Sequence, residues 1–189
     1  MTVPSCKKHN EDFHQLDERF RFYLQCIQSN DVALDAFKDK TFRGLSRPSH
    51  QGLVRSLGSK SHRVTVGGMQ TFAMEVDPRQ QSLYFEKIIR GIYFNLFEKR
   101  AEGRVGSVSK DFIDPQLDYR ALMSHVLSIV NNPTAIIGEA TNPRVFQFKY
   151  ALVQAEKNEE FVIVLRFYEA IEVYGFVASN EVPVDAQII

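Results

Sequence analysis

A helix that is apolar on most of its circumference is the strongest constraint on how this chain of 189 residues can fold. Asp77 and Pro78 suit the start of such a helix, and the apolar pattern continues until Gly103. Side chains at spacings of three and four form one face, and others lie off that face: Phe85, Ile88, Ile89, Ile92 and Leu96 on the first, and Leu83, Phe94 and Phe97 elsewhere. Such a helix needs cover on several sides, so we expect it at the centre of the fold.

The C-terminal third alternates apolar and polar residues, which is typical of antiparallel strands. We expect strands at 135–137, 145–153, 161–168 and 171–177. The charged segment 156–160 suits a turn between the second and the third of them. Between the central helix and this sheet, residues 104–112 are expected to form a loop and residues 114–130 an amphipathic helix.

The N-terminal half is expected to contain helices and one β-hairpin. Apolar spacing predicts an amphipathic helix over 10–29, a shorter helix that residues 29–31 can cap, and a third helix over 48–57. Two glycines between 62–66 and 69–76 suit the tight turn of a hairpin. The fold class is therefore α+β, with N-terminal helices and a β-hairpin, a long buried central helix, and a C-terminal antiparallel sheet.

Charge is balanced overall but uneven along the chain. Lys and Arg together number 23, as do Asp and Glu, so no net field attracts nucleic acid or an anionic membrane. Between residues 38 and 63, however, Asp39 is the only acid among seven basic side chains. Five of these are candidate contacts for the phosphates of DNA or RNA: Arg43, Arg47, Arg55, Lys60 and Arg63. The alternative is a solvated surface whose charge is balanced by acids that the fold brings near.

Two cations, Lys87 and Arg90, interrupt the apolar pattern of the central helix. A charged group in such surroundings needs a carboxylate or a phosphate as its partner. We expect both to form structural ion pairs.

Cysteine usage and hydropathy indicate the compartment. Cys6 and Cys26 can form at most one disulfide, and nothing before Cys6 resembles a secretory leader. No apolar run approaches the roughly 20 residues of a membrane span. We therefore expect a soluble protein in a reducing, cytoplasmic setting, without a membrane partner.

The first residues carry a short metal-ligand pattern. Cys6 and His9 are separated by two residues, as in a knuckle that presents two ligands to Zn²⁺, and Asn10 follows where the first helix begins. Two ligands make only half of a tetrahedral site. The alternative is a buried thiol beside a surface histidine.

Several segments resemble small bacterial HNH-endonuclease-like proteins. VPSCKKHNEDF, at residues 3–13, and LDERFRFYL, at residues 16–24, are similar to the second zinc knuckle of that family and the helix after it. Residues 86–93 resemble a further helix of those proteins, and residues 144–150 and 164–168 resemble their C-terminal sheet. In that family, a first knuckle and a strand with the catalytic histidine come earlier in the chain.

The resemblance implies metal-dependent hydrolysis of nucleic-acid phosphodiesters. A histidine would act as general base, Mg²⁺ or another divalent ion would stabilise charge on the phosphate, and an asparagine would orient the histidine. By this resemblance Asn10 is the asparagine, while Cys6 and His9 are half of a structural zinc site. Residues 1–30 would then be the second half of the knuckle with its helix, and residues 31–189 the α+β body, in one continuous globular unit.

The sequence departs from the family at the active site. The first knuckle and the base histidine have no counterpart in this sequence. Either an upstream half is missing, or the protein has kept the scaffold and lost the active site. His14, one helical turn before Glu18, is the nearest stand-in for a catalytic or metal-binding side chain, and its alternative is a solvated helix residue. We therefore expect a chain that is not catalytically competent. The alternative function is a non-catalytic module that binds nucleic acid, a protein partner or a second copy of itself.

Overall fold

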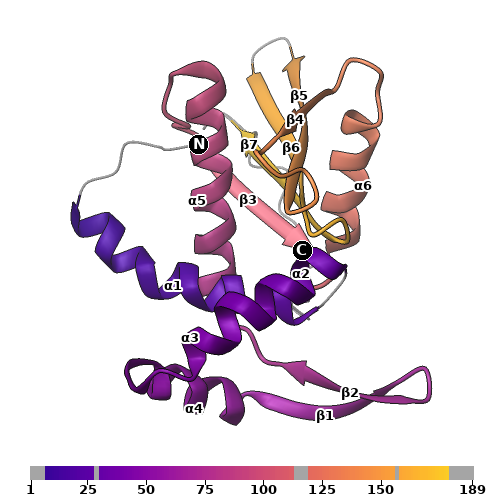
Figure 1. Ribbon diagram of the computed structural model, residues 1–189. Coiled ribbons are helices and arrows are strands. Elements are labelled where there is room, and N and C mark those ends of the chain that lie inside the picture. Colours follow the sequence, from indigo (N-terminus) through magenta and orange to yellow (C-terminus); the bar gives the residue numbers. More distant parts are fainter. Residues whose placement is uncertain (1–6, 28–29, 113–118, 156–157, 179–189) are drawn as a thin grey trace.

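The computed structural model describes residues 7–27, 30–112, 119–155 and 158–178 (Figure 1). Its elements follow one another as α1 (Lys7–Cys26), α2 (Asp31–Ala36), the π-helix η1 (Phe37–Phe42), α3 (Arg43–Leu45), the 3-10 turn η2 (Pro48–His50), α4 (Gln51–Ser59), β1 (Ser61–Val66), β2 (Met69–Met74), α5 (Pro78–Phe97), β3 (Arg104–Ser109), α6 (Tyr119–Val130), β4 (Ile136–Glu139), β5 (Phe146–Ala155), β6 (Asn158–Phe167) and β7 (Ile171–Ala178). The α+β class expected from the sequence is confirmed.

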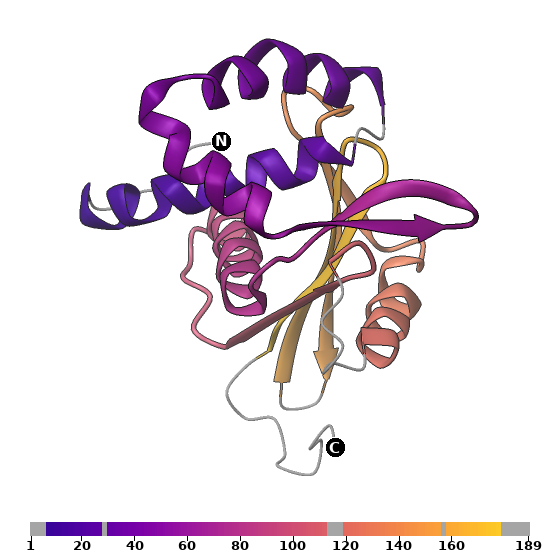
Figure 2. The same ribbon diagram turned by 90° about the horizontal axis from the view of Figure 1, so that it is seen from below.

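The C-terminal strands form one antiparallel sheet with helices on both faces. Its strand order is β3-β7-β6-β5-β4, and every neighbouring pair is antiparallel. Figures 1 and 2 show α5 against one face and α6 against the other. The alternation of β6 explains this arrangement, because Phe161 and Ile163 belong to the core around α5 and Val162 to the core around α6.

Helix α5 is buried at the centre of the fold, as its sequence predicts. Phe85 and Ile89 have no exposed surface, and Ile92 has almost none. The Phe85 ring contacts Phe20 of α1 on one side, at a centroid distance of 5.8 Å, and Phe167 of β6 on another, at 6.2 Å. Burying each such side chain contributes about 1.5–3 kcal/mol, so α5 joins the N-terminal helices to the sheet.

Local sequence signals set several boundaries. The Asp77 side chain accepts hydrogen bonds from the backbone N–H groups of Arg79 and Gln80 and caps α5, while Pro78 occupies the first turn. Gly67 and Gly68 have φ values of 58° and 81°, the left-handed conformation that the hairpin turn requires. The predicted hairpin and the predicted start of α5 are both confirmed.

Three expectations about the elements need correction, and a fourth is not tested. Residues 104–109 form strand β3 rather than a loop, because they pair with β7 at one edge of the sheet. Helix α5 ends at Phe97, where Glu98 adopts the left-handed conformation, rather than near Gly103. Pro48 opens a 3-10 turn, and α4 begins only at Gln51. Helix α6 is described from Tyr119, and the predicted start at residue 114 lies outside the described residues.

The two cations of α5 differ in their partners. Lys87 forms the expected ion pair, with its Nζ 2.7 Å from Asp17 Oδ2 of α1, and its Nζ also lies 4.8 Å from the centre of the Phe13 ring. Arg90 does not pair with a carboxylate in the described residues. Its guanidinium donates to the backbone carbonyls of Ala101 and Gly103, since it is exposed near the end of α5 and reaches the segment that leads into β3. No helix in the described part of the chain is long and apolar enough to cross a membrane.

The contact between α5 and β7 depends on Gly175, which has no side chain. A Cβ at Gly175 would lie 2.5 Å from Ile89 Cδ1 and 3.2 Å from the Gly106 carbonyl oxygen. We expect Gly175→Ala to lower the free energy of unfolding by about 1–3 kcal/mol, because Ile89 is fully buried and cannot move without disturbing the core. Urea unfolding followed by circular dichroism measures this.

Gly52→Ala is the matched control. Gly52 lies in α4 and would place its Cβ in open space. The free energy of unfolding should stay the same or rise by up to about 1 kcal/mol, because alanine favours helix. If both variants unfold alike, the packing of α5 on β7 does not depend on Gly175.

Candidate nucleic-acid interface

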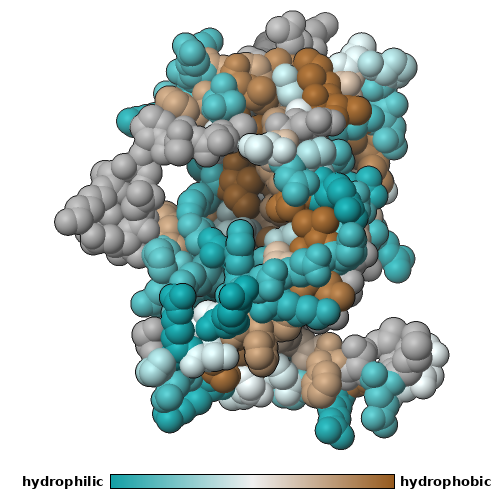
Figure 3. Space-filling view, viewed as in Figure 1, coloured by the Kyte–Doolittle hydropathy of each residue, from teal (hydrophilic) through white to brown (hydrophobic). Residues whose placement is uncertain are grey.

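The basic side chains predicted to contact phosphates lie on consecutive elements at one end of the molecule. Figure 1 shows α3, α4 and the β1–β2 hairpin together at this end. We refer to five residues as the cationic segment: Arg43, Arg47, Arg55, Lys60 and Arg63. Lys60 is half-buried and the four arginines are exposed. In Figure 3 this end of the molecule shows hydrophilic side chains with apolar ones between them.

Acidic partners account for little of this charge. Arg43 Nη2 lies 3.2 Å from Asp39 Oδ1, but both side chains are about 70% exposed, and such a pair contributes little stability. Within the described residues, no carboxylate forms an ion pair with Arg47, Arg55 or Lys60. Among the described residues, the cationic segment thus has one ion pair with a carboxylate, at Arg43.

A small half-open pocket lies beside the cationic segment, between α1 and the helices that follow α2. Arg21 and Lys40 line it with positive charge, and Phe22 and Leu53 line it with apolar surface. Glu18 and His50 also line it, with Glu18 Oε1 3.4 Å from His50 Nε2. The pocket thus combines two cations, one acid and apolar side chains between α1 and the helices that follow α2.

Two aromatic rings in this region are exposed to solvent. Phe42, at the end of η1, is 60% exposed, and Phe72, on β2, is 66% exposed. Arg63 faces Phe72 across the hairpin, with its Cζ 5.9 Å from the ring centre. Sequence reasoning did not select these rings. The signal was present for Phe72, because a two-residue turn at Gly67 and Gly68 pairs it directly with Arg63.

The residues of the HNH-like motif are only partly described. Cys6 lies outside the described residues, and so do the side chains of His9 and Asn10, whose backbone lies in the first turn of α1. His14 is exposed on α1, one turn before Glu18. In the described part of the chain, no three His, Cys, Asp or Glu side chains gather as metal ligands. The zinc and catalytic assignments stay predictions.

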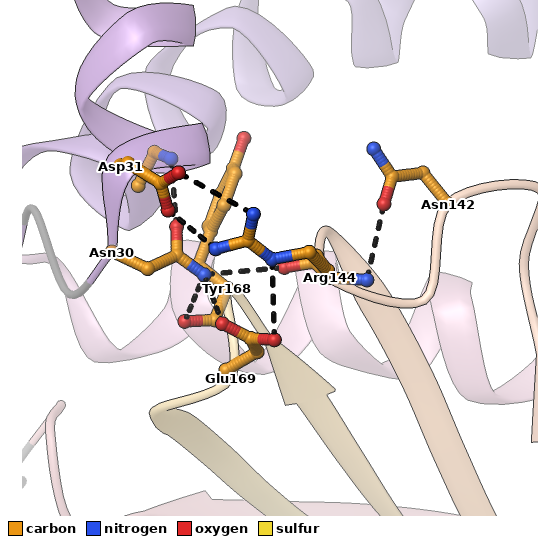
Figure 4. A network of polar contacts seen from close by, with 7 residues as sticks. Asn30, Asp31, Asn142, Arg144, Tyr168 and Glu169 are labelled. Atoms are coloured by element: carbon orange, nitrogen blue, oxygen red, sulfur yellow. Dashed lines mark hydrogen bonds and ion pairs between the residues drawn. The ribbon is translucent and has the colours of Figure 1, made fainter.

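Asn30 ties the start of α2 to the sheet (Figure 4). Its Oδ1 accepts a hydrogen bond from the Ala33 N–H at 2.8 Å and caps α2. Its Nδ2 donates to the Tyr168 carbonyl oxygen at 3.1 Å and to Glu169 Oε2 at 2.8 Å. Tyr168 and Glu169 form the turn after β6, with φ values of 49° and 62° that are unusual for residues other than glycine. One side chain thus holds both a helix start and a strained turn.

Arg144 reinforces the same junction from the segment before β5. Its guanidinium binds both carboxylate oxygens of Asp31, and its Nε lies 3.4 Å from Glu169 Oε1 (Figure 4). The hydrogen bond from Arg144 holds the pKa of Asp31 below its ordinary value, and the pKa of Arg144 is correspondingly raised. All three side chains are largely exposed, so the network orients α2 more than it stabilises the fold.

Comparisons with protein-family models, with curated proteins and with solved structures found no significant match.

The Asp31–Arg144 pair predicts a pH-dependent difference in stability. A carboxyl group whose pKa is lowered by folding stabilises the native state above its unfolded pKa, and this contribution is lost as the pH falls through the native pKa. We expect Asp31→Asn to be less stable than wild type at pH 7. The difference should close as the pH falls below the ordinary value of 3.8. Urea midpoints measured between neutral pH and pH 3 test this.

Asp35→Asn serves as its control, because Asp35 is exposed on the same short helix and has no ion pair among the described residues. Its urea midpoint should follow that of wild type at every pH. A constant gap between Asp31→Asn and wild type down to pH 3 would show that the pair does not act through the charge of Asp31.

Proposed function

We propose that this protein binds nucleic acid through phosphate contacts made by the cationic segment, and that it does so without cleaving the strand. The observation that carries the proposal is the exposure of four arginines at one end of the molecule, with one weak carboxylate pair among them in the described part of the chain. Guanidinium groups bind phosphate in a bidentate manner and are less strongly hydrated than ammonium groups. A surface of this composition suits a polyanion.

The contrast with other cations of the chain supports this proposal. Lys87 is matched by Asp17, and Arg144 by Asp31 and Glu169, so these cations serve the fold. Arg47 and Arg55 have no such partner in the described residues and hold no elements together. Their charge is available to a ligand.

The likeness to HNH endonucleases points to the same class of ligand. Proteins of that family act on nucleic acid, and one of the segments that carry the likeness, residues 16–24, lies on α1, which lines the pocket beside the cationic segment. Hydrolysis would need a general base and a metal ion. The nearest candidates are His14 and Glu18, and the carboxylate of Glu18 lies beside His50. We propose that binding is retained and hydrolysis is not.

A second candidate function, protein interaction, rests on strand β4. This strand lies at one edge of the sheet, and Ile136 and Ile137 are 53% and 66% exposed. Exposed edge strands can pair with an added strand from a partner. The phosphate-binding proposal has the wider support, because it accounts for charge on several elements at once.

The cationic segment predicts a salt-dependent affinity that two arginines dominate. If five phosphates are contacted, affinity for duplex DNA should fall on the order of 10²- to 10³-fold between about 50 and 200 mM salt. Arg47→Glu combined with Arg55→Glu should abolish binding at about 50 mM salt, because it replaces attraction with repulsion. Fluorescence anisotropy with labelled duplex and single-stranded oligonucleotides measures both effects.

Lys99→Glu combined with Arg100→Glu makes the same change in net charge at a different place. Both residues are exposed just after α5, about 30 Å along that helix from its start at the hairpin. This control should keep most of the affinity. Failure of the wild-type protein to bind either oligonucleotide at about 50 mM salt would remove the proposal, and an equal loss in both variants would show that only net charge matters.

The proposal also predicts no nuclease activity with Mg²⁺ or Mn²⁺. Positioned acid–base catalysis supplies about 10²- to 10⁴-fold and activated metal-bound water supplies more. Among the described residues, no three His, Cys, Asp or Glu side chains gather around His14 as metal ligands. Incubation of the purified chain with labelled single and double strands, followed by gel electrophoresis, tests this. Cleavage that persists through purification and disappears in His14→Ala would show that His14 and Glu18 form a working site.

A further inference from the structure

We infer that the preferred ligand is single-stranded, with unstacked bases lying against the exposed rings of Phe42 and Phe72. This inference rests on the proposed function, because it names the form of nucleic acid that the cationic segment would hold. Arginines alone contact phosphates of a duplex and of a single strand without distinguishing them. The two rings supply the distinction.

The distribution of aromatic side chains is the first observation. The chain has fifteen phenylalanines, and thirteen of them are buried or half-buried. The two exposed ones are Phe42 and Phe72, and every tyrosine with a described side chain is also buried or half-buried. Leaving such a ring in water forgoes about 1.5–3 kcal/mol of burial. Both exceptions fall within residues 38–63 or directly across the hairpin from them.

The surroundings of Phe72 are the second observation. The hairpin extends away from the body of the protein in both Figure 1 and Figure 2. Arg63 lies over the Phe72 ring from the facing strand, at 5.9 Å. A guanidinium beside an aromatic ring can bind a phosphate while the ring stacks on the adjacent base. Arg63 and Phe72 therefore form a paired contact suited to one nucleotide.

Phe42 is presented by unusual helix geometry. It is the last residue of the π-helix η1, and Arg43 follows it immediately. A π-helix rotates the residues after it relative to a continuous α-helix, and short π-helical segments occur frequently at functional sites. Phe37, at the start of η1, packs instead toward Phe22, with ring centres 6.0 Å apart. The same short helix thus has one phenylalanine packed inward and one exposed beside a cation.

Accessibility of the bases decides between the two forms of nucleic acid. In a duplex, the faces of the bases are covered by their neighbours, so an exposed ring gains little unless it unstacks a step. In a single strand, every base offers an aromatic face, and stacking on protein rings is tolerant of sequence. Each of the two rings has a cation next to it, Arg43 after Phe42 and Arg63 opposite Phe72, which suits a backbone with its bases turned toward the protein.

The test compares three ligands of equal length: a single-stranded oligonucleotide, its duplex, and a single strand whose central sugars carry no bases. Wild type should prefer the base-bearing single strand. Phe42→Leu combined with Phe72→Leu should lower single-strand affinity by about 5- to 100-fold per ring, the range for base–aromatic stacking. Affinity for the duplex and the abasic strand should not change, because the arginines remain.

Two further variants make the result specific to the rings. Phe42→Tyr with Phe72→Tyr keeps the aromatic faces and should keep single-strand affinity. Ile137→Ala removes an apolar side chain that is as exposed as Phe72 but lies on the far strand β4, and it should also bind as wild type does. All substituted positions are exposed, so the urea midpoints should remain close to that of wild type.

The outcomes separate this inference from the proposed function. Binding of all three ligands with equal affinity, by wild type and by the leucine variant alike, would overturn the inference and leave phosphate binding in place. Parallel losses for duplex and single strand would also overturn it, and would indicate that the rings act as wedges between base pairs. A wild-type protein that binds none of the ligands would remove the proposed function and this inference together.

Discussion

Burial of α5 between the N-terminal helices and the five-stranded sheet is the interaction on which the rest of the structure depends. Phe85 and Ile89 have no exposed surface, and they contact α1 on one side and the sheet on the other. The N-terminal end of α5 follows the hairpin directly, so this burial also fixes where the hairpin leaves the body. The end of the molecule that carries the cationic segment is positioned by the same contacts that form the core.

Charged side chains in this protein fall into two groups with different roles. Lys87 and Arg144 contact carboxylates of elements far from them in the sequence. Arg90 contacts carbonyl oxygens of the segment between α5 and β3. Such contacts add little net stability at a partly exposed site, but they select one arrangement of helices and sheet. The arginines between residues 43 and 63 join no distant elements in the described residues. Cations without ion-pair partners in the described residues, together with exposed aromatic rings, have the composition expected of a surface that binds a polyanion with flat bases.

Much of the fold could be predicted because it follows from local patterns. The caps at Asn30 and Asp77, the glycine turn of the hairpin and the alternation in β5 to β7 each depend on neighbours in the sequence, and each was predicted. Strand β3 was missed because its residues, Arg-Val-Gly-Ser-Val-Ser, have few large apolar side chains, and its strand conformation comes from pairing with β7 about 70 residues later. The partners of Arg90 were missed for a similar reason, since backbone carbonyls leave no signature in the sequence.

The sequence by itself determined most of the elements, with β3 as the exception, and the residues able to bind phosphate, because helix and strand periods, caps and side-chain charge are local properties. Only the tertiary structure decided which cations found acidic partners and which did not, because ion pairing depends on distances between segments far apart in the chain. It also decided that Phe42 and Phe72 stay uncovered while thirteen other phenylalanines are wholly or partly buried. The identity of a residue as phenylalanine does not say whether its side chain is buried. Only the packing of its neighbours makes the ring a part of the core or a contact for a ligand.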